Sequence, residues 1–127
     1  MSEPPIPDVD IDPDGVFKYI LLTVTLTAQD GTAETKQIVR GYEDCPYHAD
    51  VNDKVTEELQ KAKSEGLVKK WSAKVLGGGR IDHDADGKKI KVYGYSMGYG
   101  KADHEDAAKL IGTSYPDYTI TCSNEGY

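Results

Sequence analysis

The sequence predicts an α+β fold, an α/β sandwich in which a single mixed β-sheet of about five to six strands is flanked by two α-helices. Blocks rich in β-branched and aromatic residues indicate strands, and two segments in which apolar residues recur every three or four positions indicate helices. The predicted order is two strands, a helix, two strands, a helix and a last strand. A chain of 127 residues has room for one domain with a real hydrophobic core and not for two. We therefore expect a single domain over residues 1–127.

The first half of the chain predicts an arm, a strand pair and a helix. Residues 1–13 are rich in Pro and Asp, which is typical of an extended arm. Residues 16–26 predict a long, largely buried strand, and after a turn signal the chain returns in a second strand over 35–42. From about Asp50 the apolar spacing becomes that of a helix, which Gly66 ends as a C-cap.

The second half predicts two more strands, a helix and a final strand. Residues 67–81 form a strand that the glycines at 77–79 interrupt or bend, and residues 88–96 alternate well enough for a strand with one buried face. The second helix begins near Asp103, its N-cap, and stops before the next proline. Residues 118–123 make the last strand.

The formal net charge of −7 argues against broad electrostatic binding to nucleic acid or to an anionic membrane surface, because both need clustered Lys and Arg. Any anion must be held locally. The start of the chain lacks a secretory signal, and no apolar run approaches membrane-spanning length, so we expect a cytoplasmic protein. Both cysteines, Cys45 and Cys122, are expected to be free thiols. A monomer is expected, because two helices cover the sheet.

Two segments suggest anion binding. Residues 47–50 lie where a loop turns into a helix, so unpaired N–H groups and the helix dipole favour an anion, and His48 would stay neutral there and could act as a general base. The loop at residues 95–100 has small residues that allow its amides to approach a phosphate. A surface histidine near an N-cap and a glycine turn remain the alternatives. Lys18 is a charge inside an apolar strand, and Arg80 is a candidate second phosphate contact.

Other chemistries find no support. Residues 10–15 and 82–87 imitate a calcium loop but lack the glutamate that its twelfth position requires. His83 and His104 have no partner at zinc spacing. Cys45 is not followed, six residues later, by the arginine that a cysteine-dependent phosphatase needs. We therefore expect no metal and no other cofactor.

Seven short blocks, in their order and spacing, resemble one known family. The resemblance runs from about residue 7 to residue 127 and is specific because all blocks occur together. The blocks are residues 7–12 (PDVDID), 14–19 (DGVFKY), 38–42 (IVRGY), 47–50 (YHAD), 76–81 (LGGGRI), 92–97 (VYGYSM) and 115–118 (YPDY). Together they resemble the Janus/ocnus family.

The resemblance implies a compact domain with a mixed sheet between two helices, and a phosphohistidine phosphatase that acts without a metal. His48 matches the family's catalytic histidine, and Lys18 matches its substrate-binding lysine. Gly98 stands where the best-known member has alanine, which keeps the backbone donor but loosens the loop. The loop residues whose backbone donors hold phosphate are Ser96, Met97 and Gly98. Three further family positions near the site, ranked as supporting, are Arg40, Arg80 and His104.

The expected reaction is hydrolysis of the phosphorus–nitrogen bond of phosphohistidine in substrate proteins. His48 would take a proton from the attacking water while Lys18 and backbone amides stabilise the phosphoryl oxygens. Direct attack by His48 through a covalent phosphoenzyme is an open variant. Two other functions are also open: a non-catalytic phosphate- or phosphoprotein-binding member of the family, and a broader phosphoamidase that also acts on phospholysine.

Overall fold

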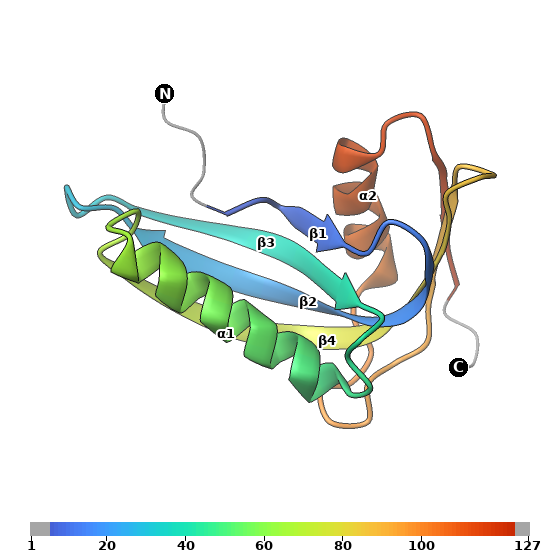
Figure 1. Cartoon of the computed structure of the whole chain (residues 1–127), viewed down its shortest axis with the longest axis horizontal. Coiled ribbons are helices and arrows are strands. Elements are labelled where there is room, and N and C mark those ends of the chain that lie inside the picture. Colours follow the sequence, from blue (N-terminus) through green and yellow to red (C-terminus); the bar gives the residue numbers. More distant parts are fainter. Residues whose placement is uncertain (1–5, 124–127) are drawn as a thin grey trace.

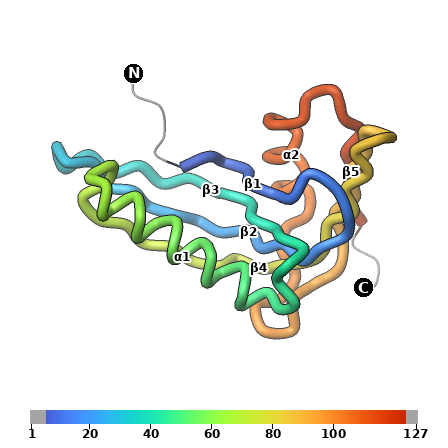
Figure 2. The backbone as a smooth tube through the Cα atoms, viewed as in Figure 1, coloured from blue at the N-terminus to red at the C-terminus, as the bar shows by residue number. Residues whose placement is uncertain are grey.

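The computed structural model describes residues 6–123, which form one curved sheet with a helix packed on each face (Figure 1). The smooth backbone trace shows α1 running along the long central strands and α2 lying against the opposite side near the other end of the sheet (Figure 2). In chain order the elements are β1 (Val9–Ile11), β2 (Gly15–Thr27), β3 (Ala33–Tyr42), α1 (His48–Ser64), β4 (Lys70–Asp84), β5 (Lys89–Tyr93), α2 (His104–Ser114) and β6 (Thr119–Cys122).

The sheet is mixed, with the strand order β1-β3-β2-β4-β5-β6. The long strand β2 lies between β3 and β4 and is antiparallel to both, and β5 is antiparallel to β4. The two outer strands run parallel to their neighbours, β1 beside β3 and β6 beside β5. The predicted α+β class, a single mixed sheet with two helices, is confirmed.

The side chains of β2 divide the core between the two faces of the sheet. Successive residues of a strand point to opposite faces, so even and odd positions of β2 are buried in different clusters. The cluster beneath α1 includes Ile20, Leu22, Val24, Ile38, Val51, Val55 and Leu59. The cluster beneath α2 includes Phe17, Tyr19, Leu21, Val39, Ile81, Ala107 and Ile111. Burial on both faces explains why β2 is a nearly continuous apolar run.

The structure differs from the predicted elements in several places. Residues 9–11, expected in the extended arm, form the edge strand β1. Helix α1 begins at His48, two residues earlier than expected. Strand β4 continues through the three glycines, and the predicted irregularity is a shift in register beside Gly77, opposite Leu21 and Leu22 of β2. Strand β5 ends at Tyr93.

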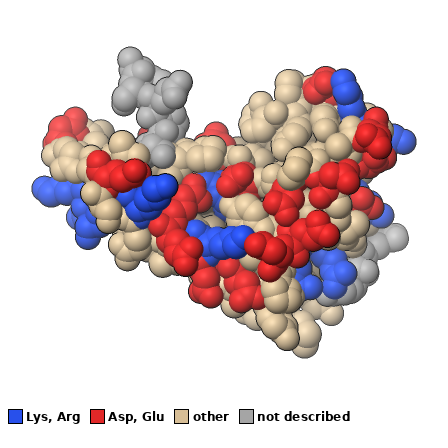
Figure 3. Space-filling model, in the orientation of Figure 1, with Lys and Arg blue, Asp and Glu red and all other residues tan. Residues whose placement is uncertain are grey.

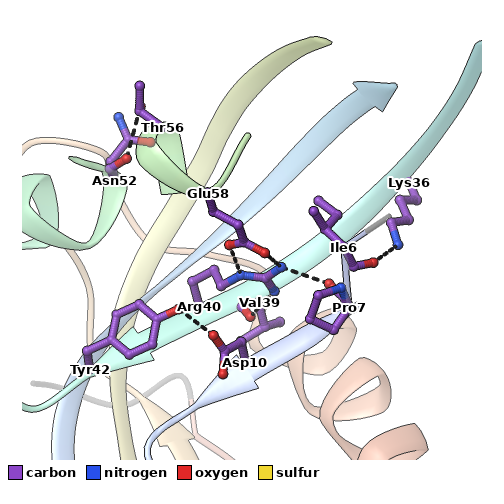
Figure 4. Close-up of polar contacts among 10 residues, drawn as sticks. All are labelled: Ile6, Pro7, Asp10, Lys36, Val39, Arg40, Tyr42, Asn52, Thr56 and Glu58. Carbon is purple, nitrogen blue, oxygen red and sulfur yellow. Dashed lines mark hydrogen bonds and ion pairs between the residues drawn. The ribbon is translucent and has the colours of Figure 1, made fainter. Parts of the chain in front are cut away.

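Arg40 ties α1, β3 and the chain before β1 together (Figure 4). Its side chain is fully buried, and its guanidinium donates to both carboxylate oxygens of Glu58 at 2.9 Å. The same group donates to the carbonyl oxygens of Val39 at 2.9 Å and Pro7 at 2.8 Å. A buried guanidinium is tolerated only when its donors are paired, so this network is a structural requirement of the fold.

Glu58→Ala should lower the free energy of unfolding by about 3 kcal/mol, because it leaves the Arg40 guanidinium buried without its counter-ion. Urea unfolding of both proteins measures the difference. Asp117→Ala is the matched control, since it breaks an ion pair on the surface. In that pair the Lys88 side chain is 60% exposed and the Asp117 side chain is 62% exposed. Equal effects of the two substitutions would contradict a structural role for the Arg40 network.

Candidate active site

A cavity of about 530 Å³ opens between the start of α1, strand β2 and the loop that follows β5. It brings together five of the residues that the sequence predicted for the site: Lys18, His48, Ser96, Met97 and Gly98. The rest of its wall consists of Pro46, Tyr47, Ala49, Tyr95 and Tyr99. Tyr95 and Tyr99 belong to the loop that follows β5, and Tyr99 also packs against the core cluster beneath α1.

His48 is the first residue of α1 and is held by a single hydrogen bond from its ring. Its Nε2 lies 2.9 Å from the carbonyl oxygen of Gly79. A carbonyl oxygen only accepts, so Nε2 carries the hydrogen and donates it. In the neutral ring the lone pair therefore lies on Nδ1. His48 has the tautomer that a proton acceptor needs, with Nδ1 as its basic atom.

The surroundings of His48 keep its ring neutral. Burial lowers the pKa of His48, and the positive charges of Lys18 and Arg80 lower it further, while the bond to Gly79 opposes them. The first N–H groups of a helix, where His48 lies, also disfavour a cation. His48 is therefore uncharged at neutral pH and ready to accept a proton.

The missing side chain of Gly78 makes room for the His48 ring. A Cβ atom at this position would lie 2.7 Å from Cδ2 of His48 and 2.8 Å from the carbonyl oxygen of Tyr19. Glycine inside a strand often marks the close approach of another group. The run at residues 77–79 carried that signal, which the sequence analysis interpreted as a bend in the strand.

Gly78→Ala should displace the His48 ring and lower the free energy of unfolding by about 1–3 kcal/mol, as overpacking does. The NMR signal of the His48 Nε2 hydrogen should shift as its bond to Gly79 breaks. Gly98→Ala is the control for stability, because a Cβ there meets nothing within 4 Å. An unchanged His48 signal in Gly78→Ala would show that the ring does not depend on this glycine.

The loop after β5 folds around Ser96. The amide of Ser96 donates to the Gly100 carbonyl at 3.1 Å, the Gly100 amide donates back at 2.8 Å, and the Ser96 hydroxyl accepts from the Tyr99 amide at 3.1 Å. Ser96 therefore shapes the loop, and its own amide is occupied. Within residues 6–123 the amides of Met97 and Gly98 have no partner, which leaves them available to an anion.

Lys18 and Arg80 lie side by side on neighbouring strands. They are register partners between β2 and β4, so their side chains share the face of the sheet on which α1 lies. Both line a smaller hollow of about 180 Å³, which shares Lys18 and Pro46 with the main cavity. Acidic side chains dominate the middle of the surface in Figure 3. Glu43 lines the same hollow, so Lys18 and Arg80 bring two positive charges to it against one negative charge.

The structure keeps His104 and Arg40 out of the cavity wall. His104 is buried at the start of α2, where its Nε2 donates to the Gly94 carbonyl at 2.7 Å. Its Nδ1 consequently accepts from the Tyr19 hydroxyl, 2.5 Å away. Gly94 has a φ of +77° and begins the loop that lines the cavity. His104 thus supports the loop from behind, and Arg40 serves the network described above.

Acid should destabilise the protein through two of its buried side chains, His48 and His104. Burial lowers the pKa of His104 as it does that of His48, so below pH 6.5 the unfolded chain binds protons that the folded chain does not. The free energy of unfolding therefore decreases as the pH is lowered, by up to about 1.4 kcal/mol per pH unit for each of these two histidines. In His104→Gln this fall between pH 6.5 and 5 should be shallower, as urea unfolding at several pH values would show. An equally steep fall would contradict the assignment.

Two kinds of feature are missing from the part of the chain that the structure describes. No three side chains among its His, Cys, Asp and Glu residues gather as metal ligands would. No helix over residues 6–123 is long and apolar enough to cross a membrane.

Comparison with known proteins identifies the family. The model of the Janus/Ocnus family matches residues 4–119. The chain belongs to the Janus/Ocnus family. Relatives in this family include the 14 kDa phosphohistidine phosphatase of Sus scrofa, 52% identical over 96% of this chain and 93% of the relative. The 14 kDa phosphohistidine phosphatase of Homo sapiens is 50% identical over 96% of this chain and 94% of the relative. The sex-regulated protein janus-A of Drosophila yakuba is 47% identical over 96% of this chain and 82% of the relative.

Proposed function

We propose that this member of the Janus/Ocnus family is a protein phosphohistidine phosphatase, a hydrolase with His48 as its general base. The observation that carries the proposal is the tautomer of His48, whose neutral ring has its lone pair on Nδ1, together with the cavity that His48 and Lys18 both line. The pig and human relatives that are named phosphohistidine phosphatase support it, at 52% and 50% identity over nearly the whole chain.

In the proposed reaction the oxygen of a water molecule bonds to phosphorus as the phosphorus–nitrogen bond breaks. His48 Nδ1 takes one proton of the water and releases it to solvent afterwards. The bonding electron pair stays with the leaving nitrogen, and the substrate ring, which enters protonated on its other nitrogen, leaves as neutral imidazole. Lys18 and the amides of Met97 and Gly98 stabilise the phosphoryl oxygens as charge develops on them.

The proposal includes no metal. A protonated imidazole is a good leaving group, so positioning and charge stabilisation are enough to hydrolyse this bond. The substrates are proteins that carry phosphohistidine, and we propose that the chain acts on them as a monomer in the cytoplasm. Arg80, beside Lys18 and in the adjoining hollow, adds positive charge to the phosphate site.

The wild-type chain should release phosphate from a phosphohistidine peptide in the presence of excess chelator. His48→Ala should lower kcat by about two to four orders of magnitude, as removal of a general base does. Phosphoserine and phosphotyrosine peptides should not be hydrolysed. The measurement is phosphate release at saturating peptide, with circular dichroism to confirm that the variant is folded.

Three outcomes would change the proposal. Activity lost to the chelator would refute the metal-free route. Phosphate bound to His48 after alkaline quenching, detected by mass spectrometry, would replace the water route by a covalent phosphoenzyme. Binding of the peptide without turnover would favour a non-catalytic member of the family. The janus-A relative is an example of a family member whose name states no activity.

A further inference from the structure

The exposed apolar side chains of this protein gather around the candidate active site. Six large hydrophobic side chains are exposed among residues 6–123, and three of them, Tyr47, Tyr95 and Met97, line the main cavity. A fourth, Val16, lines the adjoining hollow. Exposed apolar groups that gather beside a cavity mark a binding surface more often than isolated ones do.

Tyr47 and Met97 have no structural role that would explain their positions. Their side chains are 69% and 93% exposed, and neither belongs to a core cluster. The cap of α1 uses the backbone of Tyr47: its amide donates to the Asp50 carboxylate at 3.0 Å, and its carbonyl accepts from the Asp50 amide at 3.0 Å. The phenol ring of Tyr47 and the thioether of Met97 are therefore available to a ligand.

We propose that Tyr47 and Met97 clamp the imidazole ring of the phosphohistidine substrate and so select its leaving group; this inference rests on the proposed function. A phosphoryl group held at Lys18 and the loop amides is bonded directly to the leaving ring. The ring must therefore lie in the remainder of the same cavity. Tyr47 borders that space from the start of α1, and Met97 borders it from the loop after β5.

The chemistry of the two side chains suits a flat ring. An aromatic ring packs face to face or edge to face on the Tyr47 ring, and a thioether sulfur makes favourable contacts with aromatic rings. The aliphatic chain of phospholysine offers no aromatic face, and phosphoramidate, which carries only ammonia as leaving group, offers no carbon at all. The clamp therefore favours phosphohistidine over other phosphorus–nitrogen compounds that the same phosphate site would hydrolyse.

The test compares kcat/KM for a phosphohistidine peptide with kcat/KM for phosphoramidate in the wild-type chain, Tyr47→Ala and Met97→Ala. The ratio of the two values should fall about two- to tenfold in each variant, the size of one aromatic contact. Tyr47→Phe and Met97→Leu should restore most of the ratio. Leu67→Ala is the control, because Leu67 is 53% exposed beyond the other end of α1 and lies outside the cavity.

The outcomes separate this inference from the proposed function. An unchanged ratio in Tyr47→Ala and Met97→Ala, or an equal loss on both substrates, overturns the clamp while the phosphatase stands. If the wild-type chain hydrolyses neither substrate, the proposed function fails, and the clamp is judged by binding alone. In that case calorimetry with a stable phosphonate analogue of phosphohistidine in a peptide should show weaker binding to both variants but not to Leu67→Ala, and equal binding refutes the clamp.

Discussion

The absence of side chains at three consecutive positions of β4 determines how the site is assembled. Backbone atoms of Ala102 lie where a Cβ of Gly77 would be, the His48 ring lies where a Cβ of Gly78 would be, and His104 approaches Gly79 in the same way. Both helices therefore begin against the same short stretch of strand. The Gly78 backbone also pairs with the end of the loop, through the Gly100 carbonyl at 3.0 Å and the Ala102 amide at 3.1 Å. One stretch of bare backbone fixes His48 and the loop after β5 relative to each other.

Three cations lie on one face of the sheet, and they differ in what surrounds them. Lys18, Arg40 and Arg80 all point to the face on which α1 lies, because Arg40 and Arg80 are opposite Ile20 and Lys18 in register. Glu58 neutralises Arg40 inside the core. Lys18 and Arg80 act on the first turn of α1, where their charges lower the pKa of His48. A chain with a net charge of −7 thus places two positive charges close to the neutral His48 ring.

The fold was predictable where local pattern and burial agree. The spacing of apolar residues located α1, and the apolar run of β2 reported its burial on both faces. Strand β1 was missed because its three residues are stabilised by parallel pairing with β3, which no local pattern encodes. The family blocks pointed to His48 and Lys18, and the structure places both in one cavity. They could not show that the amide of Ser96 is occupied or that Tyr47 borders the cavity, since both facts depend on how the loop after β5 folds back.

The proposed mechanism requires the proton affinity of the His48 ring to differ between the free protein and its complex with substrate. Burial and the charges of Lys18 and Arg80 lower the pKa of His48, which keeps the ring from being protonated before a substrate arrives. In the proposed mechanism, a bound phosphoryl group would bring negative charge to the same two cations and cancel much of their effect on the ring. The proton affinity of Nδ1 would then rise when the proton of the attacking water is removed. The bond from Nε2 to the Gly79 carbonyl favours the protonated ring as well, so His48 can accept the proton without changing its orientation.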